Sequence, residues 1–134
     1  MNNSGKSVFG LEPNVAAGLA YIPVLFCHLI VSIGILATDR SNKLPRFHAI
    51  QSLMLSASVL VGGVIFFIFS FVIIIFSAAA DVPALSLLAF AAYFVFLLYV
   101  LLVAVGLIIG CIKAFQGQIF RLPIIGSLAD KWSN

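Results

Sequence analysis

Three long runs of apolar residues dominate the pattern along the chain. They cover residues 15–37, 52–76 and 85–112, and none of them contains Lys, Arg, Asp or Glu. A helix that rises about 1.5 Å per residue needs about 20 apolar residues to cross the roughly 30 Å hydrocarbon core of a bilayer. Open sheets are excluded there, because they would leave backbone amides unpaired in lipid. We therefore predict three transmembrane helices over these residues.

The segments between the runs predict how these helices connect. Residues 38–47 are polar and contain Asn42 and Pro45, which favour the start of a helix. Residues 77–84 are short and contain Asp81 and Pro83, which suit a reversal of the chain between two antiparallel helices. The second and third runs should therefore form a hairpin.

The two ends of the chain are less apolar than the runs. Residues 1–11 predict a flexible polar tail, and residues 12–134 predict a single helical membrane domain. In the C-terminal tail, residues 113–134, apolar positions recur at helical spacing from Ile124 onward, and Trp132 is of a type that settles at the headgroup level. The fold class predicted is an all-α membrane protein with three transmembrane helices and a C-terminal interfacial amphipathic segment.

Composition and charge agree with a membrane environment. Apolar residues make up 63% of the chain and charged residues only 8%, whereas soluble domains carry about 25% charged residues. The net charge of +3 is spread without basic runs, which argues against nucleic acid as a partner. With three spans, Lys6 falls on one side and the remaining basic residues on the other. The positive-inside bias then predicts an N-terminus outside and a C-terminus in the cytoplasm.

Small residues that recur at helical spacing predict how the helices pack. In lipid, close helix approach depends on such stripes, because hydrophobic burial gains little there. One stripe lies along the third run and just past its end, and it consists of Gly106, Gly110 and Ala114. The other lies in the second run and consists of Ser52, Ser56 and Gly63. The stripes favour packing within the chain, with a dimer or a second membrane subunit as the alternative. Pro23 in the first run also predicts a kink.

His28 is an ionisable residue inside an apolar run, which makes it a candidate for function. Three interpretations stay open. The imidazole could be neutral and bonded within the chain, for example to Ser32, or it could bond a partner subunit across a helix interface. It could also bind the metal of a haem or a chlorophyll-type pigment through a ring nitrogen.

His48 and Gln51 share one helical face at the start of the second run, beside Ser52. Snorkelling towards the headgroups and helix capping explain this placement. No carboxylate, nucleophile or second histidine stands at a helpful spacing along the chain, so neither a catalytic triad nor a metal site is predicted. The sequence therefore favours a protein that is not an enzyme and that needs no cofactor or metal.

Three segments together carry a resemblance that covers nearly the whole chain. They are residues 10–17, residues 46–53, and residues 113–117 followed by 122–126. Within them the matching positions are Glu12, Pro13, Asn14, Arg46, Phe47, His48, Gln51, Ser52, Lys113, Gln116, Gly117, Pro123 and Gly126. Their order and spacing resemble a prokaryotic family of small membrane proteins related to the twenty-kilodalton subunit of the chloroplast inner-envelope protein import translocon. His28 is not part of that pattern.

The resemblance implies a prokaryotic inner-membrane protein linked to moving or assembling proteins across a membrane. We interpret the chain as a non-catalytic accessory or assembly subunit, with the bilayer and other membrane subunits, or a second copy, as its partners. The alternative is a small cofactor-binding subunit of an energy-converting complex that uses His28. A transporter or channel is the third hypothesis.

Overall fold

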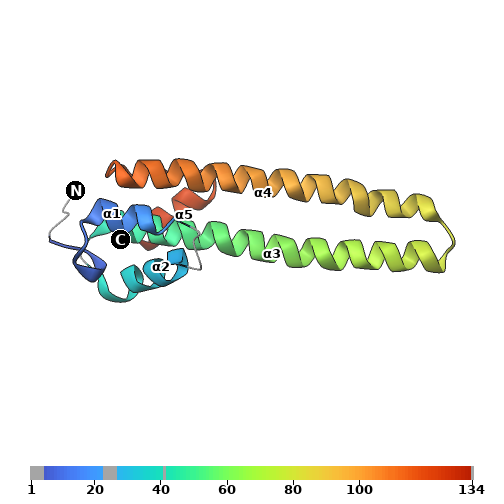
Figure 1. The fold of residues 1–134 in the computed structure, drawn as a ribbon, viewed down its shortest axis with the longest axis horizontal. Helices are drawn as coiled ribbons and strands as arrows, with labels where there is room; N and C mark the ends of the chain where they lie inside the picture. Colours follow the sequence, from blue (N-terminus) through green and yellow to red (C-terminus); the bar gives the residue numbers. More distant parts are fainter. Residues whose placement is uncertain (1–4, 23–26, 41, 134) are drawn as a thin grey trace. The chain divides into compact units, whose positions relative to one another are not determined.

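The computed structural model describes residues 5–22, 27–40 and 42–133, and these residues are predominantly helical with no strand among them. The chain divides into two compact units. We call Met1–Ser56 with Val105–Asn134 the terminal unit, and Ala57–Ala104 the hairpin unit. Two long helices, α3 and α4, contribute residues to both units (Figure 1).

The first predicted span, residues 15–37, is not one continuous helix. It is replaced by α1 (Pro13–Leu19, 7 residues) and α2 (Cys27–Thr38, 12 residues). At about 1.5 Å per residue these helices are about 10 Å and 18 Å long, so neither reaches across a bilayer core of about 30 Å. Within the described residues, the prediction of a single transmembrane helix at this place is therefore wrong.

Helix α1 ends because the chain turns after Leu19. The amides of Tyr21 and Ile22 donate to the carbonyls of Gly18 and Leu19 at 3.0 and 3.2 Å, and these are turn bonds rather than helical ones. Ile22 precedes Pro23, and the residue before a proline is disfavoured in the helical conformation. The kink predicted at Pro23 lies outside the described residues.

Helices α1 and α2 fold back against each other. Ala16 and Ala20 share a buried cluster with Val31 and Ile35. The Ser7 hydroxyl, before α1, also donates a hydrogen bond to the Asp39 carboxylate, which follows α2. A single helix over residues 15–37 would hold its ends about 35 Å apart. The segment from residue 7 to residue 39 therefore returns to where it began.

The sequence predicts a flexible tail over residues 1–11, and the described part of this segment makes contacts with the rest of the terminal unit. Val8–Gly10 form a short 3-10 helix, η1. Ser7 and Val8 are both 8% exposed, and the Ser7 amide donates to the Leu11 carbonyl at 2.7 Å. Burial of Val8 and the bond to Asp39 fix this segment against α2.

Helix α3 (Lys43–Ala79) begins nine residues before the predicted span at Ser52. Its start agrees with the helix-starting residues in the sequence, because the Asn42 amide donates to Asp39 Oδ1 at 3.2 Å just ahead of the first turn. Helix α4 (Ser86–Phe115) follows a short 3-10 helix, η2 (Pro83–Leu85). Among the described residues, Lys43–Ala79 and Pro83–Phe115 are the two segments long and apolar enough to cross a membrane.

The hairpin unit consists of the second part of α3 and the first part of α4. The Phe66 and Phe96 rings stack at 4.8 Å, and the Tyr99 hydroxyl donates to Ser58 Oγ at 2.7 Å. Most of its large apolar side chains, among them Leu60, Phe67 and Val95, point outward instead. Asp81 is the only charged residue in this stretch of sequence. Such a surface suits lipid rather than water.

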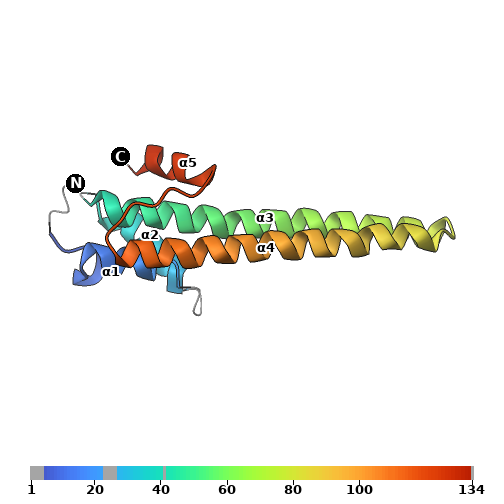
Figure 2. The ribbon, with the colours of Figure 1, turned by 90° about the horizontal axis from the view of Figure 1, so that it is seen from above.

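Helix α5 (Ile125–Trp132) belongs to the terminal unit. The connection from α4 doubles back and brings α5 alongside the first part of α3 (Figure 2). In α5 the residues Gly126 and Ala129 are buried, and Ala129 shares a cluster with Phe47 and Ile50 of α3. The C-terminal tail therefore packs on the protein along one face of a short helix.

Candidate functional site

A buried cluster of polar side chains lies in the terminal unit and consists of Tyr21, His48 and Gln51. The Tyr21 hydroxyl lies 3.0 Å from His48 Nδ1, and Gln51 Nε2 donates to the same hydroxyl at 2.9 Å. His48 and Gln51 sit one turn apart on α3, and Tyr21 reaches them from the turn after α1. His48 and Gln51 are fully buried, so they do not snorkel to the headgroups as the sequence suggested.

The bonds of this polar cluster fix where its protons lie. His48 Nε2 is 3.0 Å from the Gln118 carbonyl oxygen, which can only accept a hydrogen bond, so Nε2 carries a proton. Nδ1 then accepts from the Tyr21 hydroxyl, whose oxygen in turn accepts from Gln51. A second proton on His48 would leave Nδ1 and the Tyr21 hydroxyl competing as donors. The arrangement therefore suits a neutral imidazole.

Gln51 ties the chain after α4 to α3. Its Nε2 donates to the Phe120 carbonyl at 3.2 Å, and its Oε1 accepts from the Leu122 amide at 3.2 Å. Together with the bond from His48 to Gln118, these contacts hold residues 118–122 without regular secondary structure of their own. Buried backbone groups outside a helix need such partners. The polar cluster therefore acts as a structural anchor for this segment.

Sequence reasoning missed two members of these polar contacts, Tyr21 and Asp39. A tyrosine hydroxyl within an apolar run is a usable signal, because a buried Tyr normally finds a hydrogen-bond partner. Asp39 stands in a polar loop where burial is not expected, yet it is 6% exposed and accepts bonds from Ser7 and Asn42. Nothing in the local sequence pairs Asp39 with Ser7.

His28 packs against α3 rather than standing alone in the apolar run. Its Nε2 lies 3.2 Å from Ser56 Oγ, and one turn further along α2 the hydroxyl of Ser32 lies 3.1 Å from that of Ser52. His28 is therefore bonded within the chain, although to Ser56 and not to Ser32. Its Nδ1 is buried and has no hydrogen-bond partner among the described residues.

The small residues of the two stripes lie against different neighbours, not against one another. A Cβ on Gly110 would lie 2.8 Å from the Tyr21 ring, and one on Gly106 would lie 3.5 Å from Leu122. Ala114 is fully buried. On α3, Ser52 and Ser56 face α2, whereas Gly63 lies near Phe96 of the hairpin unit. Of the glycines in the two stripes, Gly110 therefore has the closest neighbour.

The residues that carry the family resemblance gather in the terminal unit. Glu12, Pro13 and Asn14 line a cavity of about 450 Å³ together with Gly117, and Asn14 Nδ2 donates to the Phe115 carbonyl at 3.1 Å. Four further positions contact neighbouring segments. Arg46 donates to the Asp39 carbonyl, Phe47 lies in the core with Ala129, Lys113 donates to Gln118, and Gly126 lies against Arg121. Gln116 and Pro123 are exposed.

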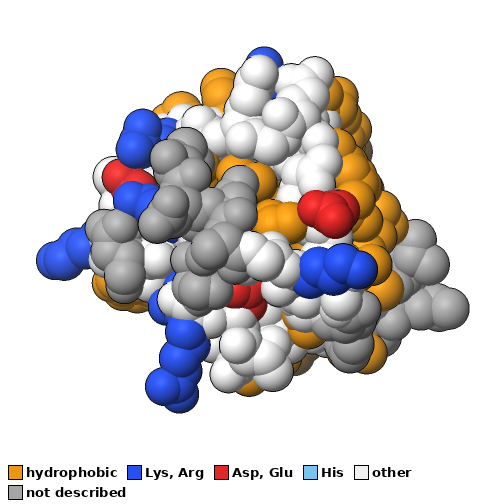
Figure 3. Space-filling view, turned by 90° about the vertical axis from the view of Figure 1, so that its left-hand side faces the viewer, with side chains coloured by type: hydrophobic (Ala, Val, Ile, Leu, Met, Phe, Trp, Pro, Cys, Tyr) orange, Lys and Arg blue, Asp and Glu red, His pale blue; other side chains and the backbone are white. Residues whose placement is uncertain are grey.

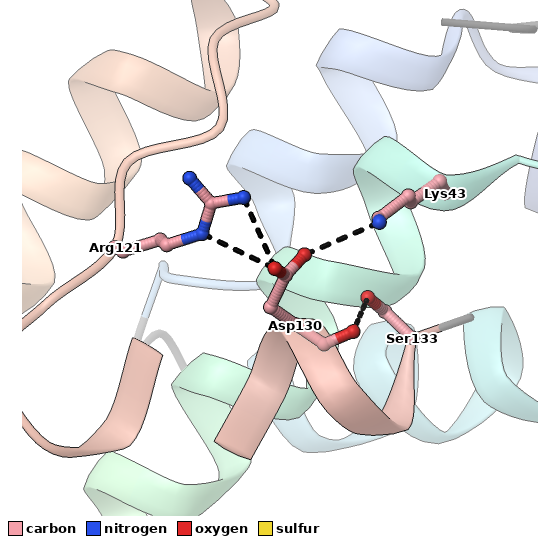
Figure 4. A network of polar contacts seen from close by, with 4 residues as sticks. All are labelled: Lys43, Arg121, Asp130 and Ser133. Carbon is pink, nitrogen blue, oxygen red and sulfur yellow. Dashed lines mark hydrogen bonds and ion pairs between the residues drawn. The ribbon is translucent and has the colours of Figure 1, made fainter. Parts of the chain in front are cut away.

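Asp130 joins α5 to the rest of the terminal unit. Its carboxylate forms ion pairs with Lys43 Nζ at 3.2 Å and with Arg121 Nη2 at 3.0 Å, as Figure 4 shows. The Lys43 ammonium, and after it the Arg121 guanidinium, hold the pKa of the Asp130 carboxyl below its usual value. We call these three residues the Asp130 clasp. It fixes α5 to the first turn of α3 and to the segment before α5.

Basic residues are confined to the terminal unit. All 7 Lys and Arg residues of the sequence fall within residues 1–56 and 105–134. They project at several points on the face in Figure 3. Residues 57–104 contain none. The hairpin unit therefore has a composition that suits lipid, whereas the terminal unit contains every Lys and Arg residue.

Over the residues that the structure describes, the chain is a small helical membrane protein, and two of these described helices are long enough to cross a membrane. Residues 12–129 match the model of the magnetosome magnetite crystal formation protein family, and the chain belongs to that family. It is also 30% identical over 129 residues to a UPF0132 membrane protein of Methanocaldococcus jannaschii, and the match covers 96% of each chain. No solved structure matches the chain.

Proposed function

We propose that this protein is a non-catalytic accessory or assembly subunit in a prokaryotic cytoplasmic membrane. The observation that carries the proposal is how its polar side chains are used. Tyr21, His48 and Gln51 bond one another and the backbone of residues 118–122, and the Asp39 and Asp130 carboxylates bond neighbouring residues. These polar groups are used to hold segments of the chain together, and such use supports a structural role rather than a catalytic one.

The proposed placement in the membrane has both termini on the cytoplasmic side. The bond between Ser7 and Asp39 is incompatible with placing the N-terminus and the loop after α2 on opposite sides of a bilayer. With α1 and α2 as a re-entrant pair, α3 and α4 cross the membrane, and every Lys and Arg falls in the unit that contains both termini. The positive-inside bias then favours the cytoplasm for that unit.

Outward-facing apolar side chains of the hairpin unit are the proposed contact with partner subunits. Leu60, Phe67 and Val95 are well exposed on α3 and α4. The sequence resemblance is to a prokaryotic family related to a protein import translocon subunit, and it supports protein translocation or membrane assembly as the process served. The family description names magnetite crystal formation, which is the building of a larger structure, and it supports an assembly role.

Site-specific photo-crosslinking in native membranes tests this proposal. A photoreactive residue at Phe67 should yield one discrete protein adduct, and the complex that contains this partner should be lost in cells without the chain. The same probe at Phe96, which stacks on Phe66, is the matched control and should react mainly within the chain. If Phe67 reacts with lipid alone and the complexes of the membrane are unchanged without the chain, the accessory role is wrong.

A cofactor-binding subunit is the second candidate, and the buried Nδ1 of His28 favours it. This nitrogen has no hydrogen-bond partner among the described residues, while Nε2 is bonded to Ser56. A neutral imidazole with a free nitrogen can bind the iron of a haem or the magnesium of a chlorophyll-type pigment. The absorption spectrum of gently purified protein tests this. A visible band that disappears in His28→Ala but persists in Ser56→Ala would support it, and a featureless spectrum would not.

A further inference from the structure

Helix α5 presents its large apolar residues outward and its small residues to the protein. Ile124, just ahead of the helix, is 85% exposed, and Leu128 and Trp132, four and eight residues further, are 39% and 57% exposed. On the opposite face, Gly126 and Ala129 are buried. From this geometry we propose that α5 stands in the cytoplasmic leaflet with this outer stripe facing lipid, Ile124 deepest and Trp132 at the headgroups.

The inner face of α5 has no room for the large residues. A Cβ on Gly126 would lie 2.6 Å from Arg121 Cα, so the helix packs directly on backbone at that point. The interior is already filled, since Ile119 packs on the cluster of Phe47 and Ile50, and Leu122 lies over Gly106. The outer stripe is thus set by close packing on the inner side, and turning α5 about its axis would break that packing.

Contacts with α3 set the direction in which α5 runs. Asp130 pairs with Lys43, the first residue of α3, whereas the chain just ahead of α5, at Phe120 and Leu122, bonds Gln51 two turns further along. Helix α5 is therefore antiparallel to α3 and lies alongside it. Over the eight residues from Ile124 to Trp132 the rise is about 12 Å. In the proposed placement α3 crosses the membrane, so Ile124 and Trp132 differ in their depth in the bilayer by about this rise.

The side chains along α5 change in the order that a leaflet requires. The end with Ile124 is apolar, whereas the end with Trp132 also carries Lys131 and the Asp130 clasp. Tryptophan and lysine together are typical of the headgroup level, where lysine meets anionic phosphate. This match between depth and polarity favours lipid as the occupant of the outer stripe, over a second copy of the chain or another protein.

Trp132 is the only tryptophan in the chain, so its fluorescence reports on α5 alone. The test uses the full chain in nanodiscs whose phospholipids carry bromine at shallow or deep acyl positions. Trp132 should be quenched more strongly by shallow than by deep bromines. In Ile124→Trp with Trp132→Phe the order should reverse, because the probe lies about 12 Å deeper. Both substitutions are at exposed positions, so the fold should persist.

Three results would overturn the proposal. Equal quenching profiles at the two positions would mean that α5 lies flat on the surface. Quenching by aqueous acrylamide without quenching by bromolipids would place α5 in water. Protection from both quenchers would mean that protein, such as a second copy, covers the stripe. The inference rests on the proposed membrane placement, but sidedness labelling of the termini tests that placement separately, so the two failures are distinguishable.

Discussion

The Ser7 hydroxyl is hydrogen-bonded to the Asp39 carboxylate across 32 residues of sequence that include the whole of the first apolar run. Asp39 is 6% exposed and also accepts from the Asn42 amide and side chain, so it connects the N-terminal segment to the start of α3. A carboxylate buried in this way needs its donors, because an unpaired buried charge is costly. The bond is therefore a strong constraint on membrane topology.

Sidedness labelling of single cysteines should place residues 6 and 131 on the same side of the membrane. The variants are Lys6→Cys, Asp81→Cys and Lys131→Cys, each in a background without Cys27 and Cys111. A membrane-impermeant maleimide added to intact cells should react with position 81 alone, and permeabilised cells should show all three. Residue 6 reacting together with residue 81 would restore three spans and contradict the contact between Ser7 and Asp39.

Removing the Tyr21 hydroxyl should destabilise the terminal unit. Tyr21→Phe leaves His48 Nδ1 without its donor and Gln51 Nε2 without one of its acceptors, and each orphaned buried group costs about 1–3 kcal/mol. Thermal unfolding in detergent, followed by circular dichroism, should show a lower midpoint. Tyr93→Phe is the matched control, since Tyr93 is exposed, and its effect should stay within about 0.5 kcal/mol. Equal midpoints for both variants would contradict a structural role for the polar cluster.

Two glycines one turn apart on α4 should respond in opposite directions to alanine. In Gly110→Ala the new methyl group would lie 2.8 Å from the Tyr21 ring, which is held by its hydrogen bonds, so overpacking should cost about 1–3 kcal/mol. In Gly106→Ala the methyl group would lie 3.5 Å from Leu122, an ordinary contact, and the better helix propensity should gain up to about 1 kcal/mol. The unfolding midpoints of the two variants measure this difference, and a loss at Gly106 as large as at Gly110 would refute it.

The sequence predicted the elements whose determinants are local. Long apolar runs marked α3 and α4, Asn42 marked the start of α3, and Asp81 with Pro83 marked the turn between the two helices. In each case the signal is a composition or a backbone preference that acts within a few residues.

The fold of residues 15–37 could not be read from the same signals. An apolar run of 23 residues suits a span, and what divides it is a turn at Tyr21 whose hydroxyl bonds side chains 27 and 30 positions away. The bond from Ser7 to Asp39 likewise joins residues with no local relationship. His48 and Gln51 were recognised as a pair, but their burial depends on the backbone of residues 118–122. Contacts between residues so far apart in the sequence do not produce a periodic pattern of apolar and polar positions from which they could be predicted.

Acidification should release α5 by protonating Asp130. Lys43 and Arg121 lower the pKa of this carboxyl below its usual 3.8, so the contribution of the Asp130 clasp is fully present above pH 3.8 and is lost as the pH falls through the lowered pKa. In nanodiscs, Trp132 emission should therefore be constant near neutral pH and change only below about pH 4. Asp130→Asn should show the acid-form emission at every pH, whereas Asp81→Asn, in the turn between α3 and α4, should titrate like the unmodified protein. A transition near pH 6 would contradict the assignment to Asp130, because the pKa of this carboxyl lies below its usual value.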